Sequence, residues 1–342
     1  MSWIGAITVL AAFALTILAT GFVRRYALEA RQLDQPNTRS SHSIPTPRGG
    51  GLAIVCTGVV AWVVLWNAGL IETRLLLALC VGGLLVAAVG LLDDRKALPA
   101  GIRLAVHFAA AIWAVFWLGG LPSLRIGDQI VHLGWVGHLL AVVGIVWTLN
   151  LFNFMDGIDG IAASEAVFVA LAGALLGLVG GGWLDVSSVG MVFAATCGGF
   201  LLWNWPPAKI FMGDVGSGYL GYVIAVLALA STRDNPISLW VWLILGGVFF
   251  VDATVTLLRR ASRGEPIHQA HCSHAYQWLA RRWGSHRRVT VAVMMLNLIW
   301  LLPCALSVTL HPDHALGIVV VALVPLVALA VVAGAGRRES AN

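Results

Sequence analysis

Long apolar stretches alternate with short polar connections along almost the whole chain. A helix needs about 20 mostly apolar residues to cross a bilayer, and about eleven such stretches recur. They lie near residues 3–23, 50–70, 73–92, 102–121, 134–152, 160–181, 186–203, 214–232, 237–258, 289–309 and 315–335. The pattern therefore predicts an all-α integral membrane protein with about eleven transmembrane helices, in which residues 1–342 form a single polytopic domain.

Composition supports this class and argues against others. Hydrophobic residues make up 59% of the 342 residues and charged residues only 11%, whereas soluble domains are typically about 25% charged. The net charge of +5 is modest, and no nucleic-acid partner is expected. None of the five cysteines forms a CxxC pair, so the sequence indicates neither a disulfide framework nor a cysteine-based zinc site.

The basic residues indicate how the chain is oriented in the membrane. Of the 21 Lys and Arg residues, all except Arg74, Arg125 and Arg233 fall on one side of the predicted spans. Basic connections stay in the cytoplasm, so the N-terminus is predicted outside and the C-terminus inside. The acidic, amide and histidine motifs lie on the same side, which predicts an active site formed by cytoplasmic loops. On the other side, LRIGDQIVHLG predicts a small hairpin or an interfacial segment.

The first motif is the pair Asp93 and Asp94, which follows a predicted span in LLDDRK. Carboxylates at a helix C-terminus face the negative end of the helix dipole, at a cost of about 0.3–1 kcal/mol each. A solvated helix end, partly neutralised by Arg95 and Lys96, is one interpretation. The other is a functional pair that binds Mg²⁺ or accepts a proton, because both tasks need clustered carboxylates.

A second motif, NFMDGIDG, places Asn153, Asp156 and Asp159 at three-residue spacing beside a predicted span. Neighbours in such a series share one face of a helix, and the intervening glycines let the backbone approach a ligand. An ordinary turn rich in Asn and Asp is the alternative. We expect a polar row directed at a ligand, because a turn explains one such residue more easily than three.

The third motif, FMGDVGSG, places Asp214 between glycines just before another span. An aspartate at this position could simply cap the helix. The competing interpretation is a carboxylate ligand for Mg²⁺, with the glycine backbone close to a diphosphate. Asn204 and Lys209, in the upstream segment WNWPPAKIF, are placed to join the same site.

The last cytoplasmic loop contains His268, His271 and His274. Their spacing alone would allow zinc, but apart from Cys272 the usual partner ligands are missing. The histidines are either ordinary surface residues or, as we prefer, donors to phosphate oxygens. Asp252 lies within a predicted span and is a functional hypothesis by default, with a polar contact between helices as the alternative.

The first cytoplasmic connection contains Arg39 and Thr46 ahead of the glycines of PTPRGGG. A solvated linker is one interpretation of this segment. The proline-rich pattern instead indicates a rigid strap that leads into the second span.

Taken in order, LLDDRK, NFMDGIDG, an asparagine ahead of FMGDVGS and a histidine-rich last loop closely resemble the polyprenyl-phosphate N-acetylhexosamine-1-phosphate transferases, or glycosyltransferase family 4. The likeness runs from Asp34 to about Arg288. In this family a UDP-linked N-acetylhexosamine gives its sugar-1-phosphate to undecaprenyl phosphate, releasing UMP and requiring Mg²⁺. The resemblance implies the same substrates here, Mg²⁺ with Mn²⁺ as a substitute ion, and a place in the bacterial cytoplasmic (inner) membrane.

The resemblance also implies roles for individual residues. Asp93 and Asp94 match the acidic pair near the acceptor phosphate, one of them acting as a base, and Asp214 matches the metal-binding aspartate. The usual lysine of the first loop is absent, and Arg39 is expected to supply its charge. The implied substrate-binding residues are Arg39, Thr46, Asn153, Asp156, Asp159, Asn204, His268, His271 and His274.

The histidine loop narrows the choice of donor. HQAHCSHAYQ lacks the consecutive histidines of the phospho-N-acetylmuramoyl-pentapeptide transferases. It looks more like the subgroup that uses UDP-GlcNAc, UDP-FucNAc or UDP-QuiNAc and initiates surface glycans such as O-antigen. The pentapeptide transferase remains an alternative. So does a secondary transporter, although transporters place ionisable residues near the bilayer midplane. Formation of a homodimer is left open.

Overall fold

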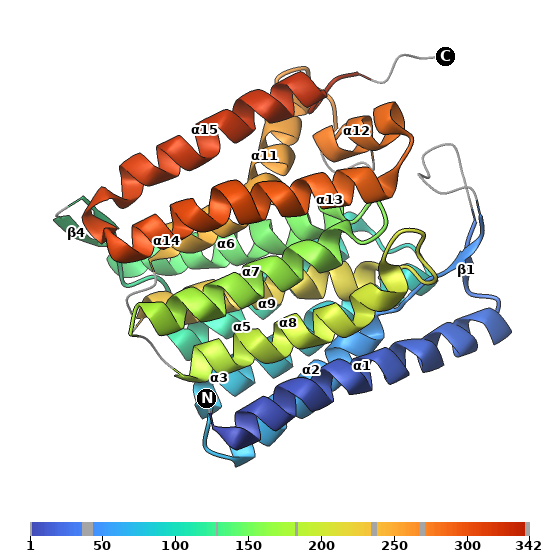
Figure 1. The fold of residues 1–342 in the computed structure, drawn as a ribbon, viewed down its shortest axis with the longest axis horizontal. Coiled ribbons are helices and arrows are strands. Elements are labelled where there is room, and N and C mark those ends of the chain that lie inside the picture. The colour runs from blue at the N-terminus through green and yellow to red at the C-terminus, as the bar shows by residue number, and fades with distance from the viewer. Residues whose placement is uncertain are drawn as a thin grey trace.

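The computed structural model describes residues 2–35, 44–127, 129–181, 184–233, 238–266 and 271–338. Long helices run side by side through most of this part of the chain (Figure 1). The longer ones are α1 (Trp3–Glu29), α2 (Gly51–Asn67), α4 (Gly83–Arg95), α5 (Ala100–Leu118), α6 (Gly134–Met155), α7 (Ile161–Val179), α8 (Leu184–Asn204), α9 (Asp214–Arg233), α11 (Gly247–Ala261) and α15 (Ala315–Ala333). The all-α membrane class predicted from the sequence is confirmed.

Shorter elements complete the fold. They are α3 (Thr73–Leu77), α10 (Leu239–Leu245), α12 (Ala275–Trp283), α13 (His286–Leu296), α14 (Leu302–Leu310), the π-helical segments η1 (Ala78–Gly82) and η2 (Asn297–Leu301), and the 3₁₀ turn η3 (Pro312–His314). Because η1 and η2 continue the flanking helices, α3–η1–α4 and α13–η2–α14 each form one apolar rod.

Within the described residues, nine helical segments are long and apolar enough to span a membrane. The pair α10–α11 makes a tenth if it counts as one span, although it bends by 77°. Helix α2 has 17 residues and is slightly shorter than the others. Every segment coincides with one of the apolar stretches in the sequence, whereas the number of spans and their orientation stay predictions.

Helix α9 is the most enclosed helix among these spans, with 89% of its apolar window buried. It packs against α4 and α6. A Cβ atom on Gly90 of α4 would collide with the backbone of Asp214, and one on Gly51 of α2 would collide with Gly216. These glycines therefore let α2 and α4 approach the first turn of α9, where the acidic motifs meet.

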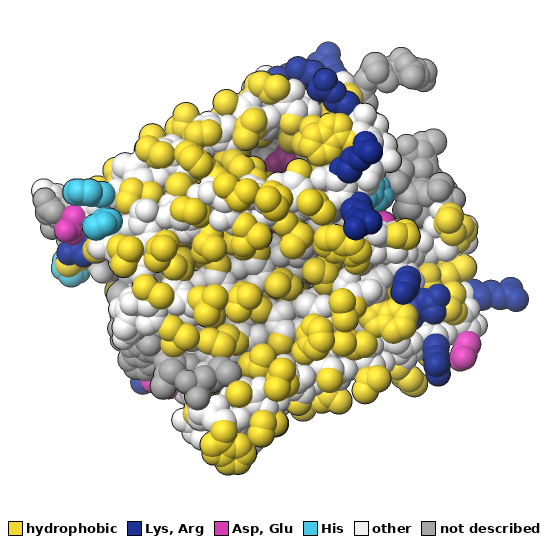
Figure 2. Space-filling model, in the orientation of Figure 1, with side chains coloured by type: hydrophobic (Ala, Val, Ile, Leu, Met, Phe, Trp, Pro, Cys, Tyr) yellow, Lys and Arg dark blue, Asp and Glu magenta, His cyan; other side chains and the backbone are white. Residues whose placement is uncertain are grey.

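The surface is divided between an apolar middle and charged ends. Figure 2 shows hydrophobic side chains across the middle of one face, with most of the visible Lys and Arg side chains at one end. Large apolar side chains such as Leu10 and Phe22 of α1 are 70% and 73% exposed. This band of exposed apolar side chains is the surface expected to contact lipid.

Two small antiparallel ribbons lie at opposite ends of the bundle (Figure 1). Strands β3 (Ser123–Ile126) and β4 (Gln129–His132) form the hairpin that the alternating sequence predicted. Strands β1 (Leu33–Asp34) and β2 (Thr46–Pro47) pair at the other end. Pro47 O accepts a hydrogen bond from Phe211 N, which ties this second ribbon to the segment before α9.

Candidate active site

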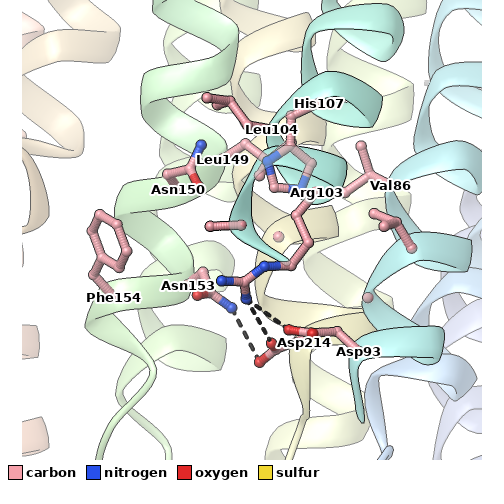
Figure 3. A pocket seen from close by; sticks show the side chains of 14 residues that line it. Val86, Asp93, Arg103, Leu104, His107, Leu149, Asn150, Asn153, Phe154 and Asp214 are labelled. Atoms are coloured by element: carbon pink, nitrogen blue, oxygen red, sulfur yellow. Dashed lines mark hydrogen bonds and ion pairs between the residues drawn. The ribbon is translucent and has the colours of Figure 1, made fainter. Parts of the chain in front are cut away.

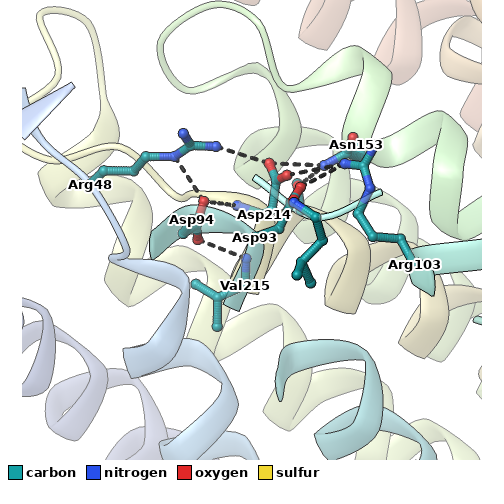
Figure 4. A network of polar contacts seen from close by, with 9 residues as sticks. Arg48, Asp93, Asp94, Arg103, Asn153, Asp214 and Val215 are labelled. Atoms are coloured by element: carbon teal, nitrogen blue, oxygen red, sulfur yellow. Dashed lines mark hydrogen bonds and ion pairs between the residues drawn. The ribbon is translucent and has the colours of Figure 1, made fainter. Parts of the chain in front are cut away.

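The C-terminal end of α4 meets the first turn of α9, and this contact brings three acidic residues together (Figure 4). The carboxylate of Asp94 accepts hydrogen bonds from the backbone N–H groups of Asp214, at 2.9 Å, and Val215, at 3.1 Å. Its side chain is only 7% exposed. Asp94 therefore caps α9 from a neighbouring helix, where the positive end of the α9 dipole stabilises its charge.

Asp93 points away from this cap. Its carboxylate accepts a hydrogen bond from the backbone N–H of Leu98 and another from Nη1 of Arg103, both at 2.6 Å. The carboxyl groups of Asp93 and Asp214 lie close enough to affect each other's pKa. The two neighbouring acids of LLDDRK thus have different structural roles. Asp94 caps helix α9, whereas Asp93 faces Asp214.

Asp214 lies between two guanidinium groups. Nη2 of Arg48 is 3.0 Å from its Oδ1, and Nη1 of Arg103 is 3.7 Å from its Oδ2. Nδ2 of Asn153 donates to the same Oδ1 at 3.2 Å and to Oγ of Ser217 at 2.9 Å. The prediction that NFMDGIDG and FMGDVGSG contribute to one site agrees with this contact.

The other acid close to this group is Asp156, which follows the end of α6. Among the described residues, no hydrogen-bond donor reaches its carboxylate. Burial, together with the negative charge of Asp214, raises the pKa of Asp156 well above its usual range. Asp156 therefore holds its proton more readily than an ordinary aspartate, and the site contains more carboxyl groups than the two arginines can neutralise.

Asp159 and Asn204 hold the central loop in place. The carboxylate of Asp159 accepts a hydrogen bond from the backbone N–H of Ala208 at 3.1 Å and lies 3.3 Å from Nδ1 of His286. Asn204 is buried, accepts from Gly160 N and donates to the carbonyl of Ile210, both at 3.0 Å. The polar row of NFMDGIDG is therefore split. Asn153 and Asp156 lie beside Asp214, whereas Asp159 stabilises the loop itself.

Two pockets share Asp214 and Asn153. The first, here called the apolar pocket, lies among α4, α5, α6 and α9 (Figure 3). Its lining includes Val86, Val89, Leu104, Leu149, Phe154, Asp93, Arg103 and His107. The second, here called the polar pocket, is lined by Asp34, Arg48, Asp156, Asp159, Asn204, Gln277 and others. A ligand in one pocket would therefore meet a ligand in the other at Asp214.

Helix α12, which directly follows the histidine loop, is fixed by an acid inside the bundle. Asp252 of α11 accepts the backbone N–H groups of Ala275, at 2.8 Å, and Tyr276, at 3.0 Å. Asp252 thus makes a polar contact between helices, the alternative that the sequence allowed. The buried ring of His274 stacks on those of His271 and Phe154, with centroids 4.9 and 6.4 Å away.

The histidines do not line either pocket in the described part of the chain. Burial, with the nearby charges of His274 and Arg260, lowers the pKa of His271 to about 4. Gln277, one turn further along α12, does reach the polar pocket. The phosphate-binding role expected of His271 and His274 stays a prediction.

Other sequence-predicted residues lie elsewhere. Arg39 and His268 fall outside the described residues. Thr46 is buried on β2 and donates its hydroxyl hydrogen bond to Ile44 O at 2.9 Å. The ammonium group of Lys209 lies over the ring of Trp203, 5.7 Å from its centroid, and Lys209 lines neither pocket.

Sequence reasoning missed Arg48 and Arg103 as site residues. From the sequence, both residues contribute only to the positive charge that predicts the orientation. The available signals were the single basic residue in PTPRGGG and the arginine in the first turn of the helix after LLDDRK. Neither signal is specific until the fold places both guanidinium groups on Asp214.

The donor atoms of the site suit a hard divalent cation. Among the described residues, no three His, Cys, Asp or Glu side chains form a ready-made metal cluster. Mg²⁺, however, is usually held by one or two carboxylates, with water and substrate phosphates completing its shell. Asp214, beside the carboxyl groups of Asp93 and Asp156, fits that mode of binding.

The fold and site together define a helical membrane protein with a carboxylate–arginine cluster between an apolar and a polar pocket. The sequence matches the model of glycosyl transferase family 4 over residues 76–232. A relative 34% identical over 83% of the chain shows the same family, so the chain belongs to the polyprenyl-phosphate N-acetylhexosamine-1-phosphate transferases and is a multi-pass sugar-phosphate transferase.

Three relatives indicate the range of the family. The chain is 34% identical over 290 residues to a probable undecaprenyl-phosphate N-acetylglucosaminyl 1-phosphate transferase of Bacillus subtilis, covering 83% of this chain and 79% of that protein. It is 32% identical over 367 residues to the decaprenyl-phosphate N-acetylglucosaminephosphotransferase of Mycobacterium tuberculosis, covering 94% and 89%. Against the phospho-N-acetylmuramoyl-pentapeptide-transferase of Moorella thermoacetica, 32% identity over 205 residues covers 53% and 63%.

Proposed function

We propose that the protein transfers N-acetylglucosamine-1-phosphate from UDP-GlcNAc to a polyprenyl phosphate, with undecaprenyl phosphate as the acceptor, and releases UMP. The observation that carries the proposal is that the apolar and polar pockets share Asp214 and Asn153. An isoprenoid chain suits the apolar pocket, with its phosphate at Arg103. A nucleotide diphosphate suits the polar pocket, with its phosphates at Arg48.

In this arrangement an oxygen of the acceptor phosphate attacks the phosphorus that carries the sugar. The bond from that phosphorus to the bridging oxygen breaks, and UMP leaves with the electron pair. All reacting groups are anions, so the site has to offset repulsion. Arg103 bridges Asp93 and Asp214 and holds its positive charge where the two pockets meet.

Mg²⁺ is part of the proposal, with Mn²⁺ as a substitute, and Asp214 is its protein ligand beside Asp93 and Asp156. When bound, the ion supplies neutralisation of the diphosphate and stabilises the departing UMP. The carboxylate of Asp94 then acts indirectly, because it is committed to the N–H groups that position Asp214. Of the two neighbouring acids, Asp93 is better placed to accept a proton.

The choice of GlcNAc follows the relatives that align over most of the chain. The two N-acetylglucosamine enzymes align with 83% and 94% of it, whereas the pentapeptide transferase aligns with 53%. Initiation of a surface glycan such as O-antigen, at a bacterial inner membrane, is the role proposed for the product. A transporter is disfavoured because Asp93, Asp94 and Asp214 lie at helix ends, whereas transporters place ionisable residues within the membrane.

A donor panel tests the proposal. Purified protein with undecaprenyl phosphate and Mg²⁺ is given UDP-GlcNAc, UDP-FucNAc, UDP-QuiNAc or UDP-N-acetylmuramoyl-pentapeptide, while UMP release and the mass of the lipid are measured. UDP-GlcNAc is expected to give the fastest release. Asp214→Asn should abolish it, and Asp313→Asn, an exposed aspartate of η3, serves as the matched control. Equal or faster turnover of another donor would refute the choice of sugar.

A further inference from the structure

Arg48 is held close to Asp214 by its backbone. It directly follows strand β2, and its N–H donates to Gln32 O at 3.4 Å. Two residues further on, Gly50 N donates to the carbonyl of Phe211 at 2.9 Å. The strap predicted from PTPRGGG thus fixes the Cα atom of Arg48 against the segment that leads into α9, while its side chain extends into the polar pocket.

The guanidinium group of Arg48 bridges two carboxylates (Figure 4). Its Nε lies 2.9 Å from Oδ1 of Asp94, and its Nη2 lies 3.0 Å from Oδ1 of Asp214. The planar fork of arginine makes such divided contacts possible, because its donors point in different fixed directions. One contact can therefore be exchanged while the other persists.

A divalent cation on Asp214 would compete with Arg48 directly. Both carry positive charge, and Arg48 already lies 3.0 Å from Oδ1 of the carboxylate that would hold the ion. Arg103 is less affected, because it approaches Oδ2 at the longer distance of 3.7 Å and is anchored to Asp93 at 2.6 Å. Like charges repel strongly at a partly buried site. We therefore expect cation binding to break the contact between Arg48 and Asp214.

We propose that Arg48 exchanges partners during donor binding, leaving Asp214 to the cation and turning Nη1 and Nη2 to the donor diphosphate while Nε stays on Asp94. This inference rests on the proposed function. It gives Arg48 the role of the positively charged lysine that is usual in the first loop of this family and absent here. The two arginines are then divided by pocket, because Arg48 lines only the polar pocket and Arg103 only the apolar one. Arg48 is thus a binding residue that also couples cation and nucleotide.

The exchange predicts opposite effects of one substitution. Without nucleotide, Arg48→Gln removes the competitor at Asp214, so Mn²⁺ should bind several-fold more tightly. With Mn²⁺ present, the variant lacks the charged donors for the diphosphate, so UDP should bind about ten- to a hundredfold more weakly. Arg48→Lys keeps the charge without the fork, so UDP binding should fall less than in Arg48→Gln, with Mn²⁺ affinity near that of the wild type.

The experiment uses the full-length protein in detergent or nanodiscs, with Mn²⁺ binding followed by electron paramagnetic resonance and UDP binding by calorimetry. Arg25→Gln, on the exposed end of α1, removes the same charge and is the control. UDP binding to Arg48→Gln at wild-type strength would overturn the inference. So would a loss of Mn²⁺ affinity in both Arg48 variants, because Arg48 would then support Asp214 instead of competing for it.

The UDP probe carries no sugar, so its result is separate from the choice of donor. If the wild type binds UDP with Mn²⁺ and transfers sugar phosphate while the Arg48 variants bind like it, only the exchange fails. If the wild type transfers no sugar phosphate to any polyprenyl phosphate, the proposed function itself fails.

Discussion

The carboxylate of Asp94 accepts the backbone N–H of Asp214 at 2.9 Å, so one acid of the site holds the helix that presents another. Asp94→Asn removes the charge from this cap. The substitution should lower the free energy of unfolding by about 1–3 kcal/mol. It should also lower kcat by about a hundredfold, because a small displacement of reacting groups costs that much.

Asp214→Asn provides the contrast to Asp94→Asn. It should abolish turnover and Mn²⁺ binding but leave thermal stability close to that of the wild type, because the cap of α9 stays intact. Thermal unfolding and turnover of the two purified variants check both expectations. Near-wild-type turnover in either variant would disprove the role given to that residue.

Asp156 makes the cation-free protein sensitive to pH. Its pKa is raised in the folded state by burial and by Asp214, so the folded protein binds its proton more readily than the unfolded chain does. The stability it contributes is present below the unfolded pKa of about 4 and is lost as pH rises through the raised value. Asp156→Asn should therefore flatten the fall in thermal stability above pH 4.

Divalent cations extend this test of Asp156. Mn²⁺ should restore more stability at pH 8 than at pH 5, since a proton on Asp156 opposes cation binding. Melting temperatures at the two pH values, with and without Mn²⁺, measure the effect. Identical pH profiles for wild type and Asp156→Asn would show that the carboxyl group titrates normally.

His271 should remain neutral over the physiological range. Its pKa is lowered to about 4 by burial and the neighbouring charges of His274 and Arg260. Its contribution to stability is therefore present above the ordinary histidine pKa of about 6.5 and is lost as pH falls through 4. In spectra of ¹³C-histidine-labelled protein, the signal absent from His271→Gln should not shift between pH 5.5 and 8. A midpoint near 6.5 would contradict the burial of this ring.

Glu165 of α7 and Asn297 of η2 form a buried pair inside the bundle. Nδ2 of Asn297 donates to Oε2 of Glu165 at 2.6 Å, while Oε1 and Asn297 Oδ1 find no donor among the described residues. A neutral, protonated carboxyl group on Glu165 could donate the hydrogen bond that Oδ1 of Asn297 lacks. Glu165→Gln, which carries N–H donors, should change stability by less than about 1 kcal/mol, whereas Glu165→Ala should cost about 2–4 kcal/mol.

Thermal unfolding of these two Glu165 variants tests the pair. Equal destabilisation by Gln and Ala would mean that the carboxylate is charged and has another partner. The pair lies between a central helix and a peripheral one, so the test also measures how firmly η2 is attached to the bundle.

The membrane class and the acidic motifs could be predicted from the sequence because both are local signals. Apolar length identifies a span, and Asp93, Asp156 and Asp214 are conspicuous among apolar neighbours. The family resemblance then predicted one shared site, and the contact from Asn153 to Asp214 agrees with it. The roles of the individual residues stay predictions.

Features that depend on which helices meet could not be predicted. Asp94 caps α9 and Asp252 caps α12, each from a different helix. The residues next to them in the sequence do not indicate which helix they contact. The 77° bend between α10 and α11 was equally hidden, because the apolar stretch continues through it. Arg48 and Arg103 resembled ordinary cytoplasmic charges until packing placed both of them on Asp214.

Transfer of the sugar together with its phosphate can be tested directly by one labelling experiment. Purified enzyme is incubated with undecaprenyl phosphate, Mg²⁺ and UDP-GlcNAc that carries ³²P in the phosphate next to the sugar. We expect the label to enter the lipid fraction while an equal amount of unlabelled UMP is released. Label that remains in UDP, or no labelled lipid at all, would show that the protein does not transfer the sugar phosphate.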